Sequence, residues 1–195
     1  YDQWCQMVSN AQHDIQDNHL EKVVLARELT LHCKDTVRPC QLLSAAMNTK
    51  GPLYYGLVQD HPDDAFIFQS PERLVQINQS TVSTEALAGS IKRGDVKESD
   101  LKHESSLLRS SKNRWEHSLV LKHIESILSH HCSSVQSSTD RHILKLPYIQ
   151  HILQPVQAQL KSNTQWATLL DRLHPTPAVC GFDQKTAQQF IKTHE

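Results

Sequence analysis

Four short apolar runs in the first half of the chain decide the fold class: LYYGLV (Leu53–Val58), AFIFQ (Ala65–Gln69), LVQI (Leu74–Ile77) and TVST (Thr81–Thr84). These runs are rich in aromatic and β-branched residues, which favour strands. The polar stretches between them are short enough to join neighbouring strands as hairpins. Because strands joined by successive hairpins run antiparallel, this half of the chain is predicted to be an antiparallel meander.

On either side of the meander, apolar residues recur every three to four positions, which is the period of an amphipathic helix. Alternation with a period of two predicts two further strands. The predicted class is therefore α+β, with a largely antiparallel sheet flanked by helices. We expect helices at 1–15, 39–47, 101–109, 112–130, 166–173 and from Asp183 as a cap onward, strands at 21–32 and 143–160, a mobile stretch at 91–100 and a polar loop at 133–139.

The composition excludes several classes of protein. The chain has 195 residues, with 20 Lys and Arg against 21 Asp and Glu, so it lacks the basic excess typical of nucleic-acid-binding proteins. Mean hydropathy is −0.50, and no apolar run is long enough to cross a membrane. The five cysteines are odd in number and form no C-x-x-C pair. This predicts reduced thiols and a cytoplasmic protein rather than a disulfide framework or a zinc knuckle.

Glu116 is the most informative charged residue. In the predicted helix 112–130 it falls at helical spacing with Val120 and Ile124. This spacing predicts a carboxylate on the apolar face, where an unpaired charge is costly. Three interpretations stay open at this point: a structural ion pair with Arg114 or with a strand lysine, a metal ligand, or a carboxylate that faces a water-filled cleft.

Four further features each have an ordinary structural explanation. Lys22 begins a predicted strand, and Glu72 lies in a turn that Pro71 stiffens. The small residues at 86–90 either form a tight bend or let the backbone approach a ligand closely. The two-proline segment 174–181 either turns a corner or shapes a pocket. Taken singly, none of these features assigns a function.

Taken as an ordered set, these segments resemble the chorismate-utilising enzymes, and among them most closely the menaquinone-type isochorismate synthases. The resemblance is carried by 22–27 (KVVLAR), 70–74 (SPERL), 84–90 (TEALAGS), 112–117 (KNRWEH), 149–152 (IQHI), 173–181 (LHPTPAVCG) and 187–191 (AQQFI). It implies a chorismate-binding fold like that of anthranilate synthase component I. Residues 1–195 would be the central part of one such domain, lacking its N-terminal portion and its C-terminal strands and helices.

The resemblance also implies a Mg²⁺-dependent conversion of chorismate, a small molecule, to isochorismate by water addition at C2 and loss of the C4 hydroxyl. By position, Lys22 matches the family's general base, Glu72 its general acid, and Glu116 one carboxylate ligand of the Mg²⁺. A base lysine needs a lowered pKa and an acid glutamate a raised one, which burial would supply for both. The substrate-pocket positions of the family match Gly89, Ser90, Ala178 and Val179, with His174 at the same wall.

Departures from the family patterns narrow the assignment. Anthranilate synthases have Gln at the position of Lys22, and para-aminobenzoate enzymes carry a nucleophilic lysine that is missing from 86–89. Salicylate synthases and siderophore-pathway isochorismate synthases share the Lys/Glu pair and stay open, as does a non-catalytic chorismate-binding fragment. The family's second Mg²⁺-binding Glu and its carboxylate-clamping Arg have no match here. The resemblance therefore implies that this chain does not turn over chorismate alone.

Overall fold

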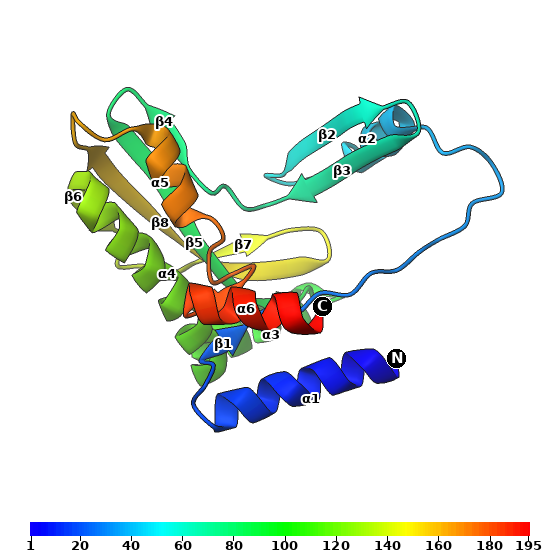
Figure 1. Cartoon of the computed structure of the whole chain (residues 1–195), viewed down its shortest axis with the longest axis horizontal. Coiled ribbons are helices and arrows are strands. Elements are labelled where there is room, and N and C mark those ends of the chain that lie inside the picture. The colour runs from blue at the N-terminus through cyan, green and yellow to red at the C-terminus, as the bar shows by residue number, and fades with distance from the viewer.

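The computed structural model describes all 195 residues and confirms the α+β class, with antiparallel sheets flanked by helices (Figure 1). The largest sheet has the strand order β4–β5–β8–β6, and β7 pairs with β8 off this path. All of its pairings are antiparallel. Its strands are β4 (Gln76–Asn78), β5 (Thr81–Lys92), β6 (Cys132–Ser137), β7 (His142–Lys145) and β8 (Ile149–Leu160).

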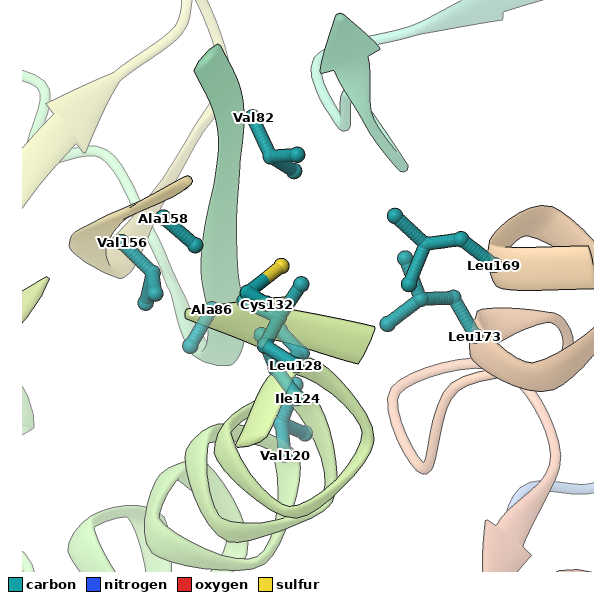
Figure 2. Close-up of a cluster of buried hydrophobic side chains, with 10 residues drawn as sticks. All are labelled: Val82, Ala86, Val120, Ile124, Leu128, Cys132, Val156, Ala158, Leu169 and Leu173. Carbon is teal, nitrogen blue, oxygen red and sulfur yellow. The ribbon is translucent and has the colours of Figure 1, made fainter. Parts of the chain in front are cut away.

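The main hydrophobic core lies where α4 (Ser111–His131) and α5 (Trp166–Leu173) pack against this sheet (Figure 2). On α4, three buried residues lie four positions apart and so share one helix face. On the strands, every second residue points to the same side. This packing holds α4 against β5, and both elements carry candidate site residues. The core residues are Val82, Ala86, Val120, Ile124, Leu128, Cys132, Val156, Ala158, Leu169 and Leu173.

Replacing Leu128 with alanine is expected to lower the free energy of unfolding by about 2–5 kcal/mol, because it leaves a cavity in a packed core. Leu128 is fully buried, with 0% of its surface exposed. Urea denaturation followed by circular dichroism measures the change. Leu101→Ala, at a helical position that is 51% exposed, is the matched control and should change stability by less than about 0.5 kcal/mol. Equal losses in both variants would contradict this account of the core.

A second, smaller core joins the two ends of the chain. Here α1 (Asp2–Gln16) and α6 (Gln184–His194) lie beside β1 (Lys22–Val23), which pairs antiparallel with β9 (Gly181–Phe182) (Figure 1). The α6 cap is confirmed, since the Asp183 side chain accepts a hydrogen bond from the Lys185 N–H at 3.1 Å. The buried apolar residues of this core are Ala11, Leu20, Cys180, Ala187 and Phe190.

The predicted single meander is wrong. β2 (Tyr54–His61) and β3 (Asp64–Ser70) form a two-stranded sheet of their own beside α2 (Pro39–Ala46), away from the larger sheet (Figure 1). The chain leaves this hairpin at Pro71, which has no N–H for a strand ladder, and then enters β4 of the larger sheet.

The predicted strand 21–32 is also wrong beyond its start. Only Lys22–Val23 pair as a strand, and their partner β9 is equally short. Beyond them the chain has no neighbouring strand, and Leu29 and Leu31 are exposed. Alternation predicts which residues could line a strand, but a strand forms only where a second backbone satisfies its N–H and C=O groups.

Two other predictions around β8 need correction. The predicted loop 133–139 is largely the strand β6, which pairs with β8 despite its polar sequence. The predicted single strand 143–160 is a hairpin of β7 and β8. It breaks around Pro147, where the Leu146 N–H donates to the Ile149 carbonyl oxygen at 2.9 Å. Proline permits such a turn because it fixes φ and lacks a donor.

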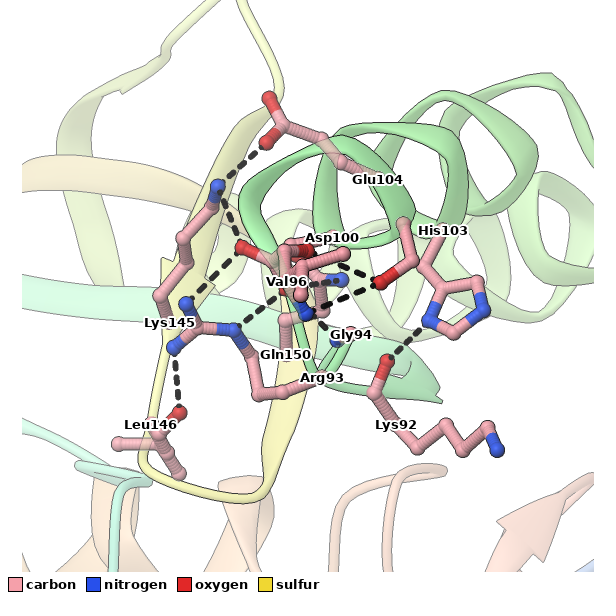
Figure 3. A network of polar contacts seen from close by, with 11 residues as sticks. Lys92, Arg93, Gly94, Val96, Asp100, His103, Glu104, Lys145, Leu146 and Gln150 are labelled. Atoms are coloured by element: carbon pink, nitrogen blue, oxygen red, sulfur yellow. Dashed lines mark hydrogen bonds and ion pairs between the residues drawn. The ribbon is translucent and has the colours of Figure 1, made fainter.

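The stretch 91–100, expected to be mobile, is ordered around the buried Asp100 (Figure 3). The Arg93 guanidinium donates to Asp100 from Nε at 2.7 Å and from Nη2 at 2.9 Å, and Lys145 Nζ lies 3.3 Å from the same carboxylate. These bonds hold the pKa of Asp100 far below its usual range. They join the end of β5 to β7 and to α3 (Lys97–Arg109), which begins four residues earlier than predicted. None of the helices combines the length and the apolar character that a membrane span needs.

Candidate active site

One hollow of about 820 Å³ brings together six of the predicted site residues. Its walls come from α1, β1, the turn after β3, the end of β5, the start of α4, the start of β8 and the segment before β9. Such a volume suits a small-molecule ligand. The predicted residues that line it are Lys22, Glu72, Gly89, Ser90, Glu116 and Ala178.

Lys22 reaches the hollow from β1. The pairing of β1 with β9 places Lys22 opposite Phe182, and its ammonium group donates to the carbonyl oxygen of Pro177. Burial lowers the pKa of Lys22, while the negative charges of Glu116 and Glu72 oppose the shift. The direction is the one a general base requires, because desolvation favours the neutral amine. Burial of the side chain supplies this direction.

Glu72 reaches the hollow from the turn between β3 and β4. Its backbone N–H donates to Ser70 Oγ at 3.1 Å. Burial raises the pKa of Glu72, and the charge of Glu85 raises it further. The Thr176 hydroxyl and the Lys22 ammonium oppose this shift. The direction is the one a general acid requires, because it keeps the carboxyl protonated to higher pH.

Glu116 lies four positions before Val120 and eight before Ile124 on α4, so it shares their helix face, as predicted, but its side chain is only partly buried. The buried stripe is formed by His117, Val120, Ile124 and Leu128, and the Glu116 side chain is 25% exposed. Its ion-pair partner is Lys112, one turn earlier on α4, with Nζ 3.5 Å from Oε1. The sequence had suggested Arg114 or a strand lysine instead. Glu116 lies near the start of α4, where this helix face lines the hollow.

The residues present supply a small donor set for a metal. No group of three or more His, Cys, Asp or Glu side chains is arranged to hold a metal ion. Glu116 is one carboxylate that lines the hollow. Mg²⁺ takes one or two protein carboxylates together with water and substrate oxygens. Glu116 therefore fits as one ligand of such an ion.

Gly89 lets β5 approach α4 closely at the hollow. Its φ is +80°, which side chains disfavour, and an added Cβ would lie 3.2 Å from Cβ of Asn113. The register of β5 against β8 shifts between Ala88 and Ser90, so the strand bulges at this point. The bulge places both Gly89 and Ser90 at the wall.

Two predicted pocket residues do not line the hollow. Val179 is 52% exposed, and His174 is an exposed residue at the end of α5, where its carbonyl oxygen accepts from Gln184 Nε2 at 3.2 Å. Of the segment 174–181, only Ala178 lines the hollow. His174 and Val179 lie in the turn that contains Pro175 and Pro177, and their side chains are exposed.

His151 lines the hollow and was missing from the predicted site. It lies opposite Ser90 in the β5–β8 pairing, with Nδ1 2.7 Å from Ser90 Oγ. Burial lowers the pKa of His151, which favours the neutral ring. The sequence marked 149–152 only as a similar segment. Its place at the site depends on the strand register, which the sequence alone does not reveal.

The chain is similar to known proteins along its whole length. A family model described as "Chorismate binding enzyme" matches residues 1–195. The isochorismate synthase MenF of Bacillus subtilis is 32% identical over 194 residues, covering 100% of this chain and 41% of that protein. The salicylate biosynthesis isochorismate synthase of Pseudomonas aeruginosa is 32% identical over 195 residues, covering 99% of this chain and 40% of that protein.

The fold agrees as well. The solved structure of MenF, the menaquinone-specific isochorismate synthase of Escherichia coli, matches with a TM-score of 0.92 at 28% identity, covering 100% of this chain and 45% of that one. The chain thus spans less than half the length of these relatives. Because the family model matches every residue and the solved structure has the same fold, the chain belongs to the family of chorismate-binding enzymes.

Proposed function

We propose that this chain carries the acid and base residues of an isochorismate synthase, which converts chorismate to isochorismate with Mg²⁺. The observation that carries the proposal is the convergence of Lys22, Glu72 and Glu116 on one hollow, although they come from three separate elements. Relatives named isochorismate synthases, matched along the whole chain, support the choice of reaction.

In the proposed reaction, a water oxygen forms a bond to C2, electron pairs shift through the ring, and the C4–O bond breaks. Neutral Lys22 accepts the proton that the attacking water loses. Protonated Glu72 donates a proton to the C4 hydroxyl, which departs as water. One water enters and one leaves, so substrate and product are isomers. The burial of both side chains supports these roles, because it favours the uncharged form of each.

Mg²⁺ would supply positive charge to hold the ring carboxylate of the substrate. Glu116 would be its ligand from this chain, with water and substrate oxygens in the remaining positions. Gly89, Ser90 and Ala178 would border the bound ring. Because Glu116 is the single carboxylate that this chain is proposed to supply to the ion, we expect the isolated 195 residues to hold Mg²⁺ weakly and to turn over little or no chorismate.

Menaquinone biosynthesis is the proposed pathway, since two of the relatives are named MenF and one of these is called menaquinone-specific. The Pseudomonas aeruginosa relative, named for salicylate biosynthesis, favours a second candidate. In that candidate, the same reaction feeds salicylate formation. The two differ in the enzyme that consumes isochorismate and not in the roles of Lys22 and Glu72.

Product analysis tests the proposal. The full-length natural protein that contains this chain is incubated with chorismate and Mg²⁺, and the products are separated by liquid chromatography. Isochorismate, lost when Mg²⁺ is chelated and restored when it is added back, is the expected result. Salicylate with pyruvate would instead assign the protein to the salicylate synthases. No product from a folded protein that binds chorismate would favour a non-catalytic role.

A further inference from the structure

Both backbone N–H groups around Glu72 are held by side chains. The Glu72 N–H donates to Ser70 Oγ at 3.1 Å, and the next N–H, that of Arg73, donates to Glu85 Oε1 at 3.3 Å. Pro71 restricts the backbone on the other side. These two hydrogen bonds therefore fix the backbone on both sides of Glu72 and so orient its side chain. The second bond is accepted by Glu85, a residue of the larger sheet.

Glu85 lies in the middle of β5 and holds the turn in two ways. Besides the backbone bond, its Oε2 lies 3.3 Å from Arg73 Nη2. Arg73 Nη1 in turn donates to Gln76 Oε1 at 2.8 Å. One residue along β5, Thr84 donates to the Leu74 carbonyl oxygen at 2.6 Å. Thr84 and Glu85, adjacent residues of β5, thus hydrogen-bond to the backbone of Leu74 and Arg73, the two residues that follow Glu72.

A gain in stability alone does not explain the ion pair between Glu85 and Arg73. The Glu85 side chain is 14% exposed and that of Arg73 28%, so forming the pair takes both charges partly out of water. Buried pairs stabilise little unless all their polar atoms are satisfied, and Arg73 Nε is buried without a partner. Without Glu85, the turn would keep only the Thr84–Leu74 bond to β5.

We propose that Glu85 is a positioning residue for Glu72: it fixes the turn through Arg73 and places a negative charge near the Glu72 carboxyl. This inference rests on the proposed function, in which Glu72 is the proton donor. The like charge of Glu85 makes ionisation of Glu72 less favourable. Glu85 therefore keeps Glu72 protonated as well as correctly oriented.

The electrostatic part agrees with the surroundings of Glu72. After burial, Glu85 is the largest cause of its raised pKa, and Lys22 acts in the opposite direction. Arg73 lies on the same turn and partly offsets the charge of Glu85. The other titratable side chains at the hollow are Glu21, Lys112, Glu116 and His151.

Two substitutions give opposite expectations for the titration of Glu72. Glu85→Gln keeps an acceptor for the Arg73 N–H but removes the like charge. The midpoint of the Glu72 titration, which is the pH at which half of its carboxyl groups are ionised, should therefore fall. Arg73→Met leaves Glu85 unpaired, so the midpoint should rise. The carboxyl-carbon resonance of Glu72, followed by NMR against pH and assigned with Glu72→Gln, measures both. Glu98→Gln, which removes an 80%-exposed carboxylate on α3, is the control and should leave the midpoint unchanged.

Kinetics provide a second readout. In Glu85→Gln, the limb of the pH–kcat profile that belongs to Glu72 should move to lower pH. Above that midpoint, kcat falls tenfold for each unit of the shift, while KM for chorismate stays within about twofold. Glu85→Asp, which keeps the charge, should restore most of kcat. A purely structural role predicts instead a uniform loss with no change in the profile.

An unmoved Glu72 midpoint in both Glu85→Gln and Arg73→Met would overturn the inference. If one variant fails to fold, as judged by its thermal melt, the sign of the shift in the other still decides. The NMR titration needs no turnover, so it remains decisive even if the protein makes no isochorismate. A missing activity would therefore count against the proposed function alone.

Discussion

Replacing Lys22 with alanine is expected to abolish isochorismate formation, with kcat falling by at least about 10²–10⁴-fold, the usual contribution of a general base. The loss should lie in kcat rather than in KM, because Lys22 is proposed to act on water and not to bind the ring. Chromatographic product analysis at saturating chorismate and Mg²⁺ measures it.

Two further variants separate chemistry from structure at this position. Lys22→Gln keeps an N–H donor for the Pro177 carbonyl oxygen but cannot act as a base, so it should be as inactive as Lys22→Ala. Lys102→Ala, at a side chain that is 73% exposed on α3, should keep normal activity. If Lys22→Gln retained most of the activity, the ammonium group would be a structural donor and the water would need another base.

Replacing Glu72 with glutamine is expected to have the second-largest effect, a fall in kcat of about 10²–10⁴-fold. Glutamine preserves the size and polarity of the side chain but cannot release a proton to the departing hydroxyl. Glu72→Asp should recover part of the activity, because it restores the carboxyl group at a shorter reach.

Steady-state assays across pH provide the check on Glu72. Above the Glu72 midpoint of the wild-type protein, activity should fall as the carboxyl ionises, and Glu72→Gln should lack this dependence. Glu98→Gln serves again as the control for the loss of one carboxylate. A Glu72→Gln variant with normal kcat would assign proton donation to a different group.

The directions of the two pKa shifts work together. The pKa of Lys22 is lowered, so its neutral form appears at lower pH than in the unfolded chain. The pKa of Glu72 is raised, so its protonated form persists to higher pH. The shifts therefore increase the fraction of molecules in which Lys22 is neutral and Glu72 protonated together.

With these directions of the pKa shifts, burial of the charged form of each side chain costs folding free energy. A lysine with a lowered folded-state pKa costs folding free energy at low pH, where it is charged, and this cost disappears as pH rises past its unfolded-state pKa. A glutamate with a raised pKa costs free energy at high pH, and the cost disappears as pH falls below its unfolded-state pKa. At neutral pH each ionised form is disfavoured by burial. Such residues are typical of functional sites.

Local sequence patterns were sufficient for the elements whose stability is decided within a few residues. The helix 166–173 has the predicted bounds, and α6 begins at its Asp183 cap. Helical hydrogen bonds connect residues four apart, so periodicity and capping carry most of the information. The segments that place Lys22, Glu72 and Glu116 in family order could likewise be recognised in the sequence.

The formation of the strands and the positions of the site residues depended on contacts with residues distant in the sequence. The predicted strand 21–32 shrinks to two residues for want of a neighbour, while the polar β6 forms because β8 satisfies its backbone. Glu116 lines the hollow because the packing of α4 against β5 brings the start of that helix to it, and His151 reaches Ser90 through the β5–β8 register. The sequence thus determined the fold class, the helices and the candidate acid and base. Only the tertiary structure decided which side chains share the hollow, because long-range backbone pairing and core packing set their positions.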